Sequence, residues 1–406
     1  MELYIHIPFC IRKCAYCDFL SGPAEIRTQD RYMEALLKEV SLAGQMHGSD
    51  GEQVDTIFIG GGTPSAVNAA WIVALMDRIR EVFSVAENAE ITMEANPGTL
   101  TADKLAQYRQ AGINRLSIGL QSTDDGELAR LGRIHTYKEF LENYRLAREA
   151  GFTNINIDLM SALPGQTEDS YEQTLRRIVA LEPEHISAYS LIIEEGTPFG
   201  DRYGEEDRDT KGEDAQESSC WRLPSEEEDR RMYHLTKSIL AEAGYQRYEI
   251  SNYAHSGREC RHNVGYWTRV PYLGLGLGAA SYYGGQRFTN TREMEEYLQI
   301  LEWGGEDPWK ELHREIQRLT AQDAMEEFMF LGLRLTGGVS AMMFRQQFDH
   351  TIEEVYGPVL EKMCNQGLLE CIEQPKQDGS APEEVFWRLT DPGLDVSNYV
   401  LAEFLF

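Results

Sequence analysis

The feature that most restricts the fold of this 406-residue chain is a repeated alternation of two kinds of segment. Short β-branched or apolar runs alternate with amphipathic helical stretches up to about Leu191, which is typical of strand–helix units around a parallel sheet. The predicted strands are 3–9, 54–59, 90–95, 115–120, 155–160 and 185–191, with helices such as 32–46 and 137–150 between them. Because six units are too few for an eight-fold barrel, we predict an α/β fold with a partial, TIM-like (βα)6 barrel.

Polar residues and glycines lie at or just past the ends of these predicted strands. They are Cys10, Gly60 to Gly62, Glu94, Gln121, Asp158 and Tyr189. The C-terminal edge of the strands is the working face of such a barrel. We therefore expect these residues to share one face of the molecule.

The regular alternation ends after Pro198. Residues 205–217 carry seven acidic and two basic side chains without an apolar period, which predicts a solvated loop or insertion. A helix at 226–243 follows, and the aromatic and Gly-rich segments through 245–290 are candidates to extend the sheet. Residues 201–308 are therefore expected to form an acidic insertion and a sheet extension.

The last part of the chain has a different pattern. Helices at 321–335 and 352–366 and a short strand at 385–390 predict a small C-terminal helical (winged) domain over 309–406. The barrel is then expected to occupy residues 1–200.

Composition excludes several classes of protein. The hydrophobic fraction of 42% and charged fraction of 26% are those of an ordinary globular chain. The formal net charge of -29 argues against nucleic-acid binding, which needs clustered Lys and Arg. No run is long enough to span a bilayer, and residues 1–9 lack a signal-peptide pattern, so we expect a cytoplasmic protein.

Three of the seven cysteines form a Cys-x3-Cys-x2-Cys run, Cys10, Cys14 and Cys17, directly after the first predicted strand. Three thiolates can hold a four-iron four-sulfur (4Fe-4S) cluster and leave one iron without a protein ligand. The amino and carboxylate groups of S-adenosylmethionine (SAM) can chelate such an open iron. The alternative is that Cys14 and Cys17 form half of a zinc site or a thiol redox pair. No second close pair of cysteines exists, so the sequence favours the cluster.

Two neighbouring features suit the same site. Tyr16, inside the cysteine loop, is expected to pack on the adenine of SAM or to shield the cluster from water. The segment GGGTP, which begins at Gly60, would let backbone groups approach the amino group of SAM closely. A glycine run of this kind is about as often only a tight turn.

At this point the chain resembles the radical SAM proteins related to oxygen-independent coproporphyrinogen III oxidase. The matching segments are YIHIPFC at Tyr4, GGGTPS at Gly60, EANPGT at Glu94, RLSIGLQS at Arg115, IDLMSALPGQT at Ile157 and LTDPGLDVSNYV at Leu389. The resemblance implies that SAM is contacted by Tyr4, Gly61, Gly62, Thr63, Glu94, Gln121, Arg133 and Asp158. The two carboxylates can accept hydrogen bonds from ammonium or hydroxyl groups, and the guanidinium can pair with a carboxylate. Structural hydrogen bonds within the barrel are the alternative for each.

The chain departs from the oxidase pattern in two places. The oxidase has a fourth cysteine two residues after the third, where this chain has Phe19, and a long segment ahead of the first strand, whereas Tyr4 is almost the first residue here. The chain is similar instead to haem chaperones of the HemW type, which carry a His-Asn-x-x-Tyr-Trp motif. This motif is present as HNVGYW, from His262 to Trp267.

By this resemblance His262 is expected to be an axial ligand of haem iron near the mouth of the barrel. Tyr266 and Trp267 would offer flat apolar faces to the macrocycle. Cys260 is a weaker second candidate, because a buried structural thiol is its usual explanation.

The resemblance implies a haem chaperone that binds haem, SAM and a 4Fe-4S cluster and hands haem to an apo-haemoprotein. A membrane-associated haemoprotein is one acceptor that it allows, and no catalytic residue is assigned. The rival function is decarboxylation of the propionates of coproporphyrinogen III in porphyrin biosynthesis. A radical SAM enzyme that acts on another small molecule is a third. The sequence leaves open whether SAM is cleaved, which haemoprotein receives haem and whether the chain dimerises.

Overall fold

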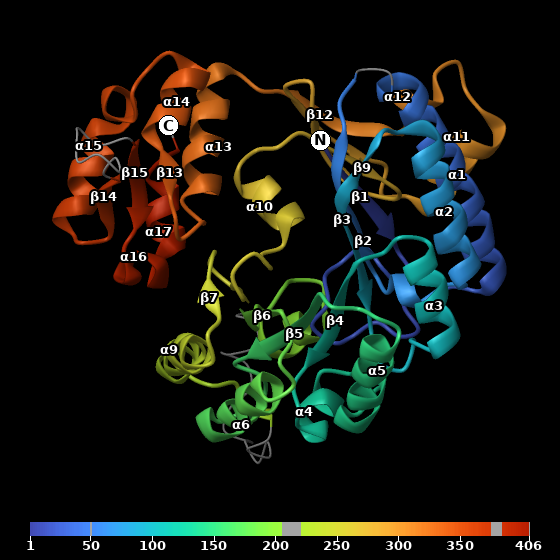
Figure 1. Ribbon diagram of the computed structural model, residues 1–406, viewed down its shortest axis with the longest axis horizontal. Coiled ribbons are helices and arrows are strands. Elements are labelled where there is room, and N and C mark those ends of the chain that lie inside the picture. The colour runs from blue at the N-terminus through green and yellow to red at the C-terminus, as the bar shows by residue number, and fades with distance from the viewer. Residues whose placement is uncertain (49–50, 205–220, 375–383, 406) are drawn as a thin grey trace.

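The computed structural model describes residues 1–48, 51–204, 221–374 and 384–405, and Figure 1 shows their arrangement. Six parallel strands form the centre of a twelve-stranded sheet. They are β1 (Glu2–Ile7), β2 (Val54–Gly61), β3 (Val85–Ala95), β4 (Arg115–Gln121), β5 (Ile155–Ser161) and β6 (His185–Ser190). All six overlap the strands expected from the sequence, and the predicted partial barrel is confirmed.

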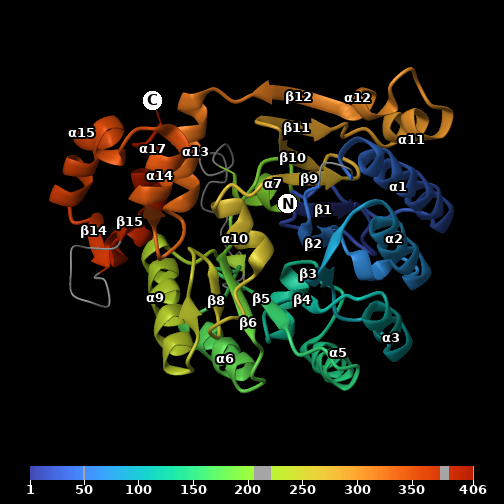
Figure 2. The same ribbon diagram turned by 45° about the horizontal axis from the view of Figure 1, so that its top comes forward.

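Helices cover the outer face of these strands, as Figures 1 and 2 show. They are α1 (Ile26–His47), α2 (Ala69–Val82), α3 (Ala102–Gln110), α4 (Asp125–Arg130), α5 (Tyr137–Glu149) and α6 (Glu168–Val179), with a 3-10 turn, η1 (Pro64–Ala66). The local sequence explains their form. Helix α5, for example, begins with a capping box of Thr136 and Glu139 and buries Phe140, Tyr144 and Ala147 against the core.

The segment after β6 extends the sheet at both edges. Strands β7 (Gln246–Arg247) and β8 (Asn252–Ala254) lie beyond β6. Beyond β1 lie β9 (Tyr272–Leu275), β10 (Ala280–Tyr283), β11 (Gln286–Asn290) and β12 (His313–Arg318). Between these strands come helices α7 (Pro198–Tyr203), α9 (Glu226–Glu242), α10 (Arg261–Trp267), α11 (Met294–Trp303) and α12 (Pro308–Leu312). The chain therefore crosses from one edge of the sheet to the other between β8 and β9.

The C-terminal part has a hydrophobic core of its own, made by residues from Met329 to Phe404. It contains α13 (Ala321–Gly332), α14 (Ala341–Phe348), α15 (Ile352–Asn365), α16 (Asp391–Asp395) and α17 (Ser397–Ala402), with a three-stranded sheet of β13 (Val339–Ser340), β15 (Glu384–Leu389) and β14 (Leu369–Gln374). Since β12 pairs in the large sheet, this core begins after the residue 309 at which we predicted the domain to start. The acidic stretch 205–217 lies outside the described residues.

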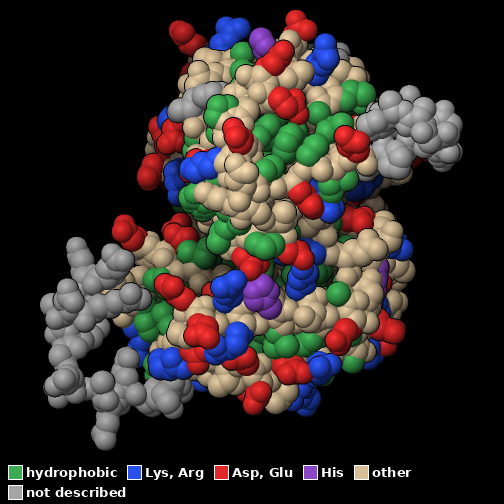
Figure 3. Space-filling view, turned by 90° about the vertical axis from the view of Figure 1, so that its left-hand side faces the viewer, with side chains coloured by type: hydrophobic (Ala, Val, Ile, Leu, Met, Phe, Trp, Pro, Cys, Tyr) green, Lys and Arg blue, Asp and Glu red, His purple; other side chains and the backbone are tan. Residues whose placement is uncertain are grey.

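The surface shows no grouping of one charge on the face in Figure 3, where acidic and basic side chains are interspersed with hydrophobic ones. Within the described part of the chain, none of the helices combines the length and the apolar character needed to cross a bilayer.

Glu39 of α1 is a buried carboxyl that ties α1 to the extension of the sheet. Its Oε2 accepts from the Tyr297 hydroxyl at 2.5 Å and the Gly276 N–H at 2.8 Å, and its Oε1 accepts from Asn290 at 2.6 Å. Burial raises the pKa of Glu39 from 4.5 to about 7. A raised pKa in the folded protein contributes stability that is present below the ordinary pKa and is lost as the pH rises through the folded value.

We therefore expect wild-type protein to lose on the order of 3 kcal/mol of unfolding free energy, relative to Glu39→Gln, between about pH 4.5 and 7. Urea unfolding of both proteins across this range measures the difference. Parallel pH profiles for the two proteins would contradict it.

Candidate functional site

A cavity of about 120 Å³ lies at the C-terminal ends of the parallel strands, where the sequence predicted the working face. The predicted residues that line it are Cys10, Cys14, Tyr16, Cys17, Gly61, Gly62, Glu94, Gln121, Arg133 and Asp158. Arg133 comes from the loop after α4, and the others come from the cysteine loop and from the C-terminal halves of β2, β3, β4 and β5 or the residue after them, because parallel strands bring their carboxyl ends to one edge. Tyr4, Thr63 and His262 are not among its lining residues.

Backbone hydrogen bonds hold the cysteine loop against the barrel. The N–H of Cys10 donates to Gly22 O at 3.0 Å, and the N–H of Ala15 donates to Leu131 O at 3.0 Å. Within the loop, Cys17 N–H donates to Cys14 O at 3.3 Å. The three thiols are half-buried. The loop thus presents its thiols from a fixed backbone.

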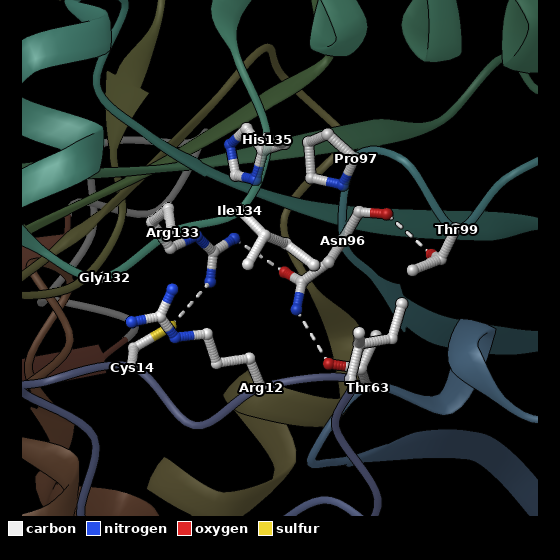
Figure 4. Close-up of a pocket in the computed structure, with 11 residues that line it drawn as sticks. Arg12, Cys14, Thr63, Asn96, Pro97, Thr99, Gly132, Arg133, Ile134 and His135 are labelled. Carbon is white, nitrogen blue, oxygen red and sulfur yellow. Dashed lines mark hydrogen bonds between the residues drawn. The ribbon is translucent and has the colours of Figure 1, made fainter.

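Arg133, in the loop after α4, links the cysteines to the end of β3 (Figure 4). Its Nη1 donates to Cys14 Sγ at 3.6 Å and its Nη2 donates to Asn96 Oδ1 at 2.7 Å. Asn96 Nδ2 in turn donates to Thr63 Oγ1 at 2.7 Å, and Thr63 donates to Cys10 Sγ at 3.5 Å. The buried Nε of Arg133 has no hydrogen-bond partner among the described residues. A cation with an unused donor therefore lies beside the thiols.

Two carboxyls lie deeper in the cavity. Glu94 Oε2 accepts from the Gly61 N–H at 3.1 Å, and burial, with the nearby charge of Asp158, raises the pKa of Glu94 to about 8. Asp158 accepts from Asn156 at 2.7 Å and from Ser117 at 3.2 Å, and burial raises its pKa as well. The pKa values of both carboxyls are raised because burial removes the water that would solvate their charged forms. Amino and hydroxyl donors of a ligand would replace that solvation.

Two residues at this site, Gly61 and Gln121, have a positive backbone φ angle. Gly61 has a φ of 107°, and a Cβ there would come within 2.5 Å of the His6 ring. Gln121 ends β4 with a φ of 76°, a left-handed conformation that is uncommon for a residue with a side chain. Strained conformations of this kind collect at ligand sites, where the surrounding structure imposes them.

These residues fit a 4Fe-4S cluster with SAM. Three half-buried thiols can hold three irons, and the Arg133 guanidinium offsets part of the negative charge of the thiolates. Glu94 suits the N–H donors of an amino group and Asp158 suits hydroxyls. Among the described residues, no group of three His, Cys, Asp or Glu side chains converges on a single metal ion.

Two predicted residues lie behind the cavity. Tyr4 points into the barrel, where its hydroxyl is 3.0 Å from His6 Nδ1 and its ring stacks on Phe58 at 6.4 Å. Thr63 supports Cys10 and Asn96. Tyr189 is the last but one residue of β6 and is not among the lining residues of the cavity.

Sequence reasoning missed Asn96, Ser117 and Asn156. Each supports a predicted residue: Asn96 binds Arg133, and the other two donate to Asp158. Period-two alternation along β4 and β5 could have placed Ser117 and Asn156 on the inner face, since each lies two residues from another inward position.

His262 lies at the opposite end of the barrel, so the prediction that placed it near the mouth is wrong. Its Nδ1 is 2.6 Å from Thr56 Oγ1, near the start of β2, and its Nε2 is 3.0 Å from the Tyr266 hydroxyl. Helix α10 closes the N-terminal end of the strands, and a Cβ at Gly265 would come within 2.0 Å of Glu2 Oε1. His262 is 1% exposed, and burial lowers its pKa to about 3, so the ring is neutral.

The aromatic residues of HNVGYW face different neighbours. Tyr266 lies with His262 inside the barrel, whereas the Trp267 ring lies 4.5 Å from the guanidinium carbon of Arg334, just after α13. Cys260 is fully buried, and its thiol donates to Glu90 Oε1 at 3.6 Å. Burial raises the pKa of the Cys260 thiol to about 12, which suits a structural role.

Comparison with known proteins agrees with this geometry. A family model described as the Radical SAM superfamily matches residues 4–178, and one described as the HemN C-terminal domain matches residues 319–374. Among solved structures, coproporphyrinogen III oxidase (HemN) from Escherichia coli, described as a radical SAM enzyme, has a TM-score of 0.81. It is 24% identical in sequence, and the match covers 99% of this chain and 89% of the other. That structure shows the fold that the two chains share.

Curated relatives are more similar in sequence. The heme chaperone HemW of Bacillus subtilis is 36% identical over 371 residues, or 90% of this chain and 92% of the relative. The heme chaperone HemW of Lactococcus lactis is 34% identical, with coverage of 99% and 96%, and that of Escherichia coli is 35% identical, with coverage of 100% and 98%. With this identity over nearly its whole length, the chain belongs to the HemW family of radical SAM proteins.

Proposed function

We propose that this protein is a haem chaperone, which binds haem and transfers it intact to an apo-haemoprotein in the cytoplasm. The observation that carries the proposal is the similarity, over nearly the whole chain, to proteins named heme chaperone HemW. The HNVGYW segment of α10 is the part of the chain to which we assign haem binding.

As a radical SAM protein, the chain uses a 4Fe-4S cluster and SAM. Such a cluster supplies electrons and an open iron site. Cys10, Cys14 and Cys17 would hold it, and Arg133 would offset its charge and bind the SAM carboxylate. Glu94 would accept hydrogen bonds from the SAM amino group, while Asp158 would accept them from ribose hydroxyls. Gly61, Gly62 and Gln121 would shape the cavity, with Tyr16 at the adenine and Tyr4 and Thr63 supporting the site from behind.

His262 is the proposed axial ligand of haem iron. A neutral imidazole is the form that binds iron, and burial keeps this ring neutral. Both ring nitrogens are hydrogen-bonded in the described structure, to Thr56 and to Tyr266. Iron must therefore replace one of these two partners, and Nε2 would be released by the loss of a single tyrosine contact.

One preparation can test the function. The cluster is reconstituted anaerobically in the full chain, and haem binding, haem transfer to apomyoglobin and conversion of coproporphyrinogen III are measured together. We expect stoichiometric haem binding and transfer without conversion. Conversion of coproporphyrinogen by a chain that binds no haem would replace the chaperone with the oxidase.

The raised pKa of Glu94 gives a second expectation. In the chain without cluster or SAM, burial raises the pKa of this carboxyl to about 8, and its ionised form is the better acceptor for the N–H donors of the SAM amino group. SAM affinity is therefore expected to rise as the pH passes through the titration of Glu94 and then to level off. Calorimetry on the cluster-loaded protein measures this, and Glu94→Gln should weaken binding and remove the slope. A slope that persists in Glu94→Gln would assign the titration to another group.

A further inference from the structure

A line of hydrogen bonds crosses the barrel interior from Asp158, in the cavity, to the residue that caps α10. Asn156 Nδ2 donates to Asp158 Oδ1 at 2.7 Å, and Asn156 Oδ1 lies 2.6 Å from His185 Nδ1. His185 Nε2 lies 2.8 Å from the Tyr248 hydroxyl, which accepts the Cys260 N–H at 3.3 Å. Asn156, His185 and Cys260 are at most 2% exposed. These three residues are thus shielded from solvent, while Asp158 and Tyr248 are half-buried.

Every donor in this line points toward Asp158. Asn156 Oδ1 only accepts, and it also receives the Ser187 hydroxyl at 3.1 Å, so the ring proton of His185 is on Nδ1. His185 Nε2 then accepts the hydrogen of Tyr248, whose oxygen remains free to accept from Cys260. Burial lowers the pKa of His185 well below its ordinary value, so the ring carries one proton. A change in the hydrogen bonds of Asp158 can therefore alter each following hydrogen bond in turn, as far as the Cys260 amide.

The far end of the line fixes the start of the helix that carries HNVGYW. Cys260 is the N-cap residue of α10, and its amide is held by Tyr248. Glu90 Oε1 accepts from the Cys260 thiol at 3.6 Å and from the His262 N–H at 3.3 Å. Figures 1 and 2 show α10 between the barrel strands and α13. The first turn of α10, and with it His262, is positioned from the barrel interior.

We propose that His185 and Tyr248 are positioning residues that couple the occupancy of the cavity at Asp158 to the position of α10. A ligand hydroxyl that donates to Asp158 shares the carboxylate with Asn156 and Ser117, and a shared acceptor holds each of its donors less strongly. A shift of the Asn156 amide changes its bond to His185, and buried hydrogen bonds in a chain reinforce one another. The step from α10 to haem rests on the proposed function, whereas the step from Asp158 to α10 does not.

Tyr248→Phe removes one hydroxyl from the line and keeps the ring. Tyr245→Phe is the matched control. Tyr245 is buried and lies just before β7, while Tyr248 lies between β7 and β8. The Tyr245 hydroxyl donates to Pro183 O at 2.6 Å, outside the line. Amide hydrogen exchange of peptides that cover α10 is measured in the cluster-loaded full chain, with and without S-adenosylhomocysteine. In wild type and Tyr245→Phe, we expect S-adenosylhomocysteine to change the amide exchange rate of these peptides by about five-fold or more. Five-fold is roughly the smallest coupling that is typical between two linked sites.

In Tyr248→Phe this change should fall below about two-fold while ligand affinity stays similar. The same variants are then titrated with haem, with and without the ligand. An unchanged exchange effect in Tyr248→Phe, or none in wild type, overturns the proposal. Exchange coupling in a chain that binds no haem would support the line of hydrogen bonds and overturn the proposed function alone. If Tyr248→Phe does not fold, His185→Leu interrupts the same line and carries the same expectation.

Discussion

Replacing Cys10, Cys14 and Cys17 together with alanine is expected to abolish the 4Fe-4S cluster. The three thiols line one cavity from a loop whose backbone is fixed to the barrel, and none of the other cysteines that the structure describes lines that cavity. Anaerobic reconstitution followed by iron and sulfide analysis should give about four of each per wild-type chain and background values in the triple variant. SAM binding should be lost together with the cluster, because SAM binds to the open iron of the cluster.

The matched control is the double variant Cys364→Ala and Cys371→Ala. Both thiols are exposed and lie in the C-terminal part of the chain, far in sequence from the cysteine loop. This variant should retain a full cluster and SAM binding. A full cluster in the triple variant, or background iron in wild type, would refute the assignment of the three cysteines.

The barrel could be predicted because its strands are buried on both faces and read as short apolar runs between helical periods. The working face followed from the same prediction, since Glu94, Gln121 and Asp158 each come at or near the end of a parallel strand. Their convergence on one cavity needed no knowledge of side-chain positions. The sequence could not predict the contacts that support the lining residues. The hydrogen bond from Arg133 to Asn96 is an example, because it joins loops that are 37 residues apart.

The place of His262 shows a different limit. The HNVGYW motif could be recognised in the sequence. Whether it lies at the N-terminal or the C-terminal end of the barrel depends on how the flanking strands pair. Strand β8 runs antiparallel to β6, so it ends at the N-terminal end of the parallel strands, and β9 runs parallel to β1, so it begins there. The segment between them, which contains α10, must therefore lie at that end. This pairing joins opposite edges of one sheet, and no local pattern in the sequence reports it.

The position of His262 leads to a prediction in which two neighbouring changes act in opposite directions. His262→Ala removes the proposed iron ligand and should abolish the Soret band of histidine-ligated haem. Loss of a residue that only supports a metal ligand costs about 10 to 100-fold in affinity, so loss of the ligand itself should cost more than about 100-fold. Tyr266→Phe instead removes the hydroxyl that lies 3.0 Å from His262 Nε2 and keeps the aromatic ring.

A hydrogen bond of this kind is worth about 1 kcal/mol net, so Tyr266→Phe should release Nε2 and strengthen haem binding about five-fold with an unchanged ligation spectrum. Spectroscopic titration of the full chain with haem measures both variants. The control is Tyr253→Phe, a buried tyrosine of β8 on the strand before α10. If His262→Ala keeps the spectrum and affinity of wild type, the histidine is structural. If Tyr266→Phe loses haem as His262→Ala does, haem binding needs the tyrosine hydroxyl, and the expected gain from releasing Nε2 is wrong.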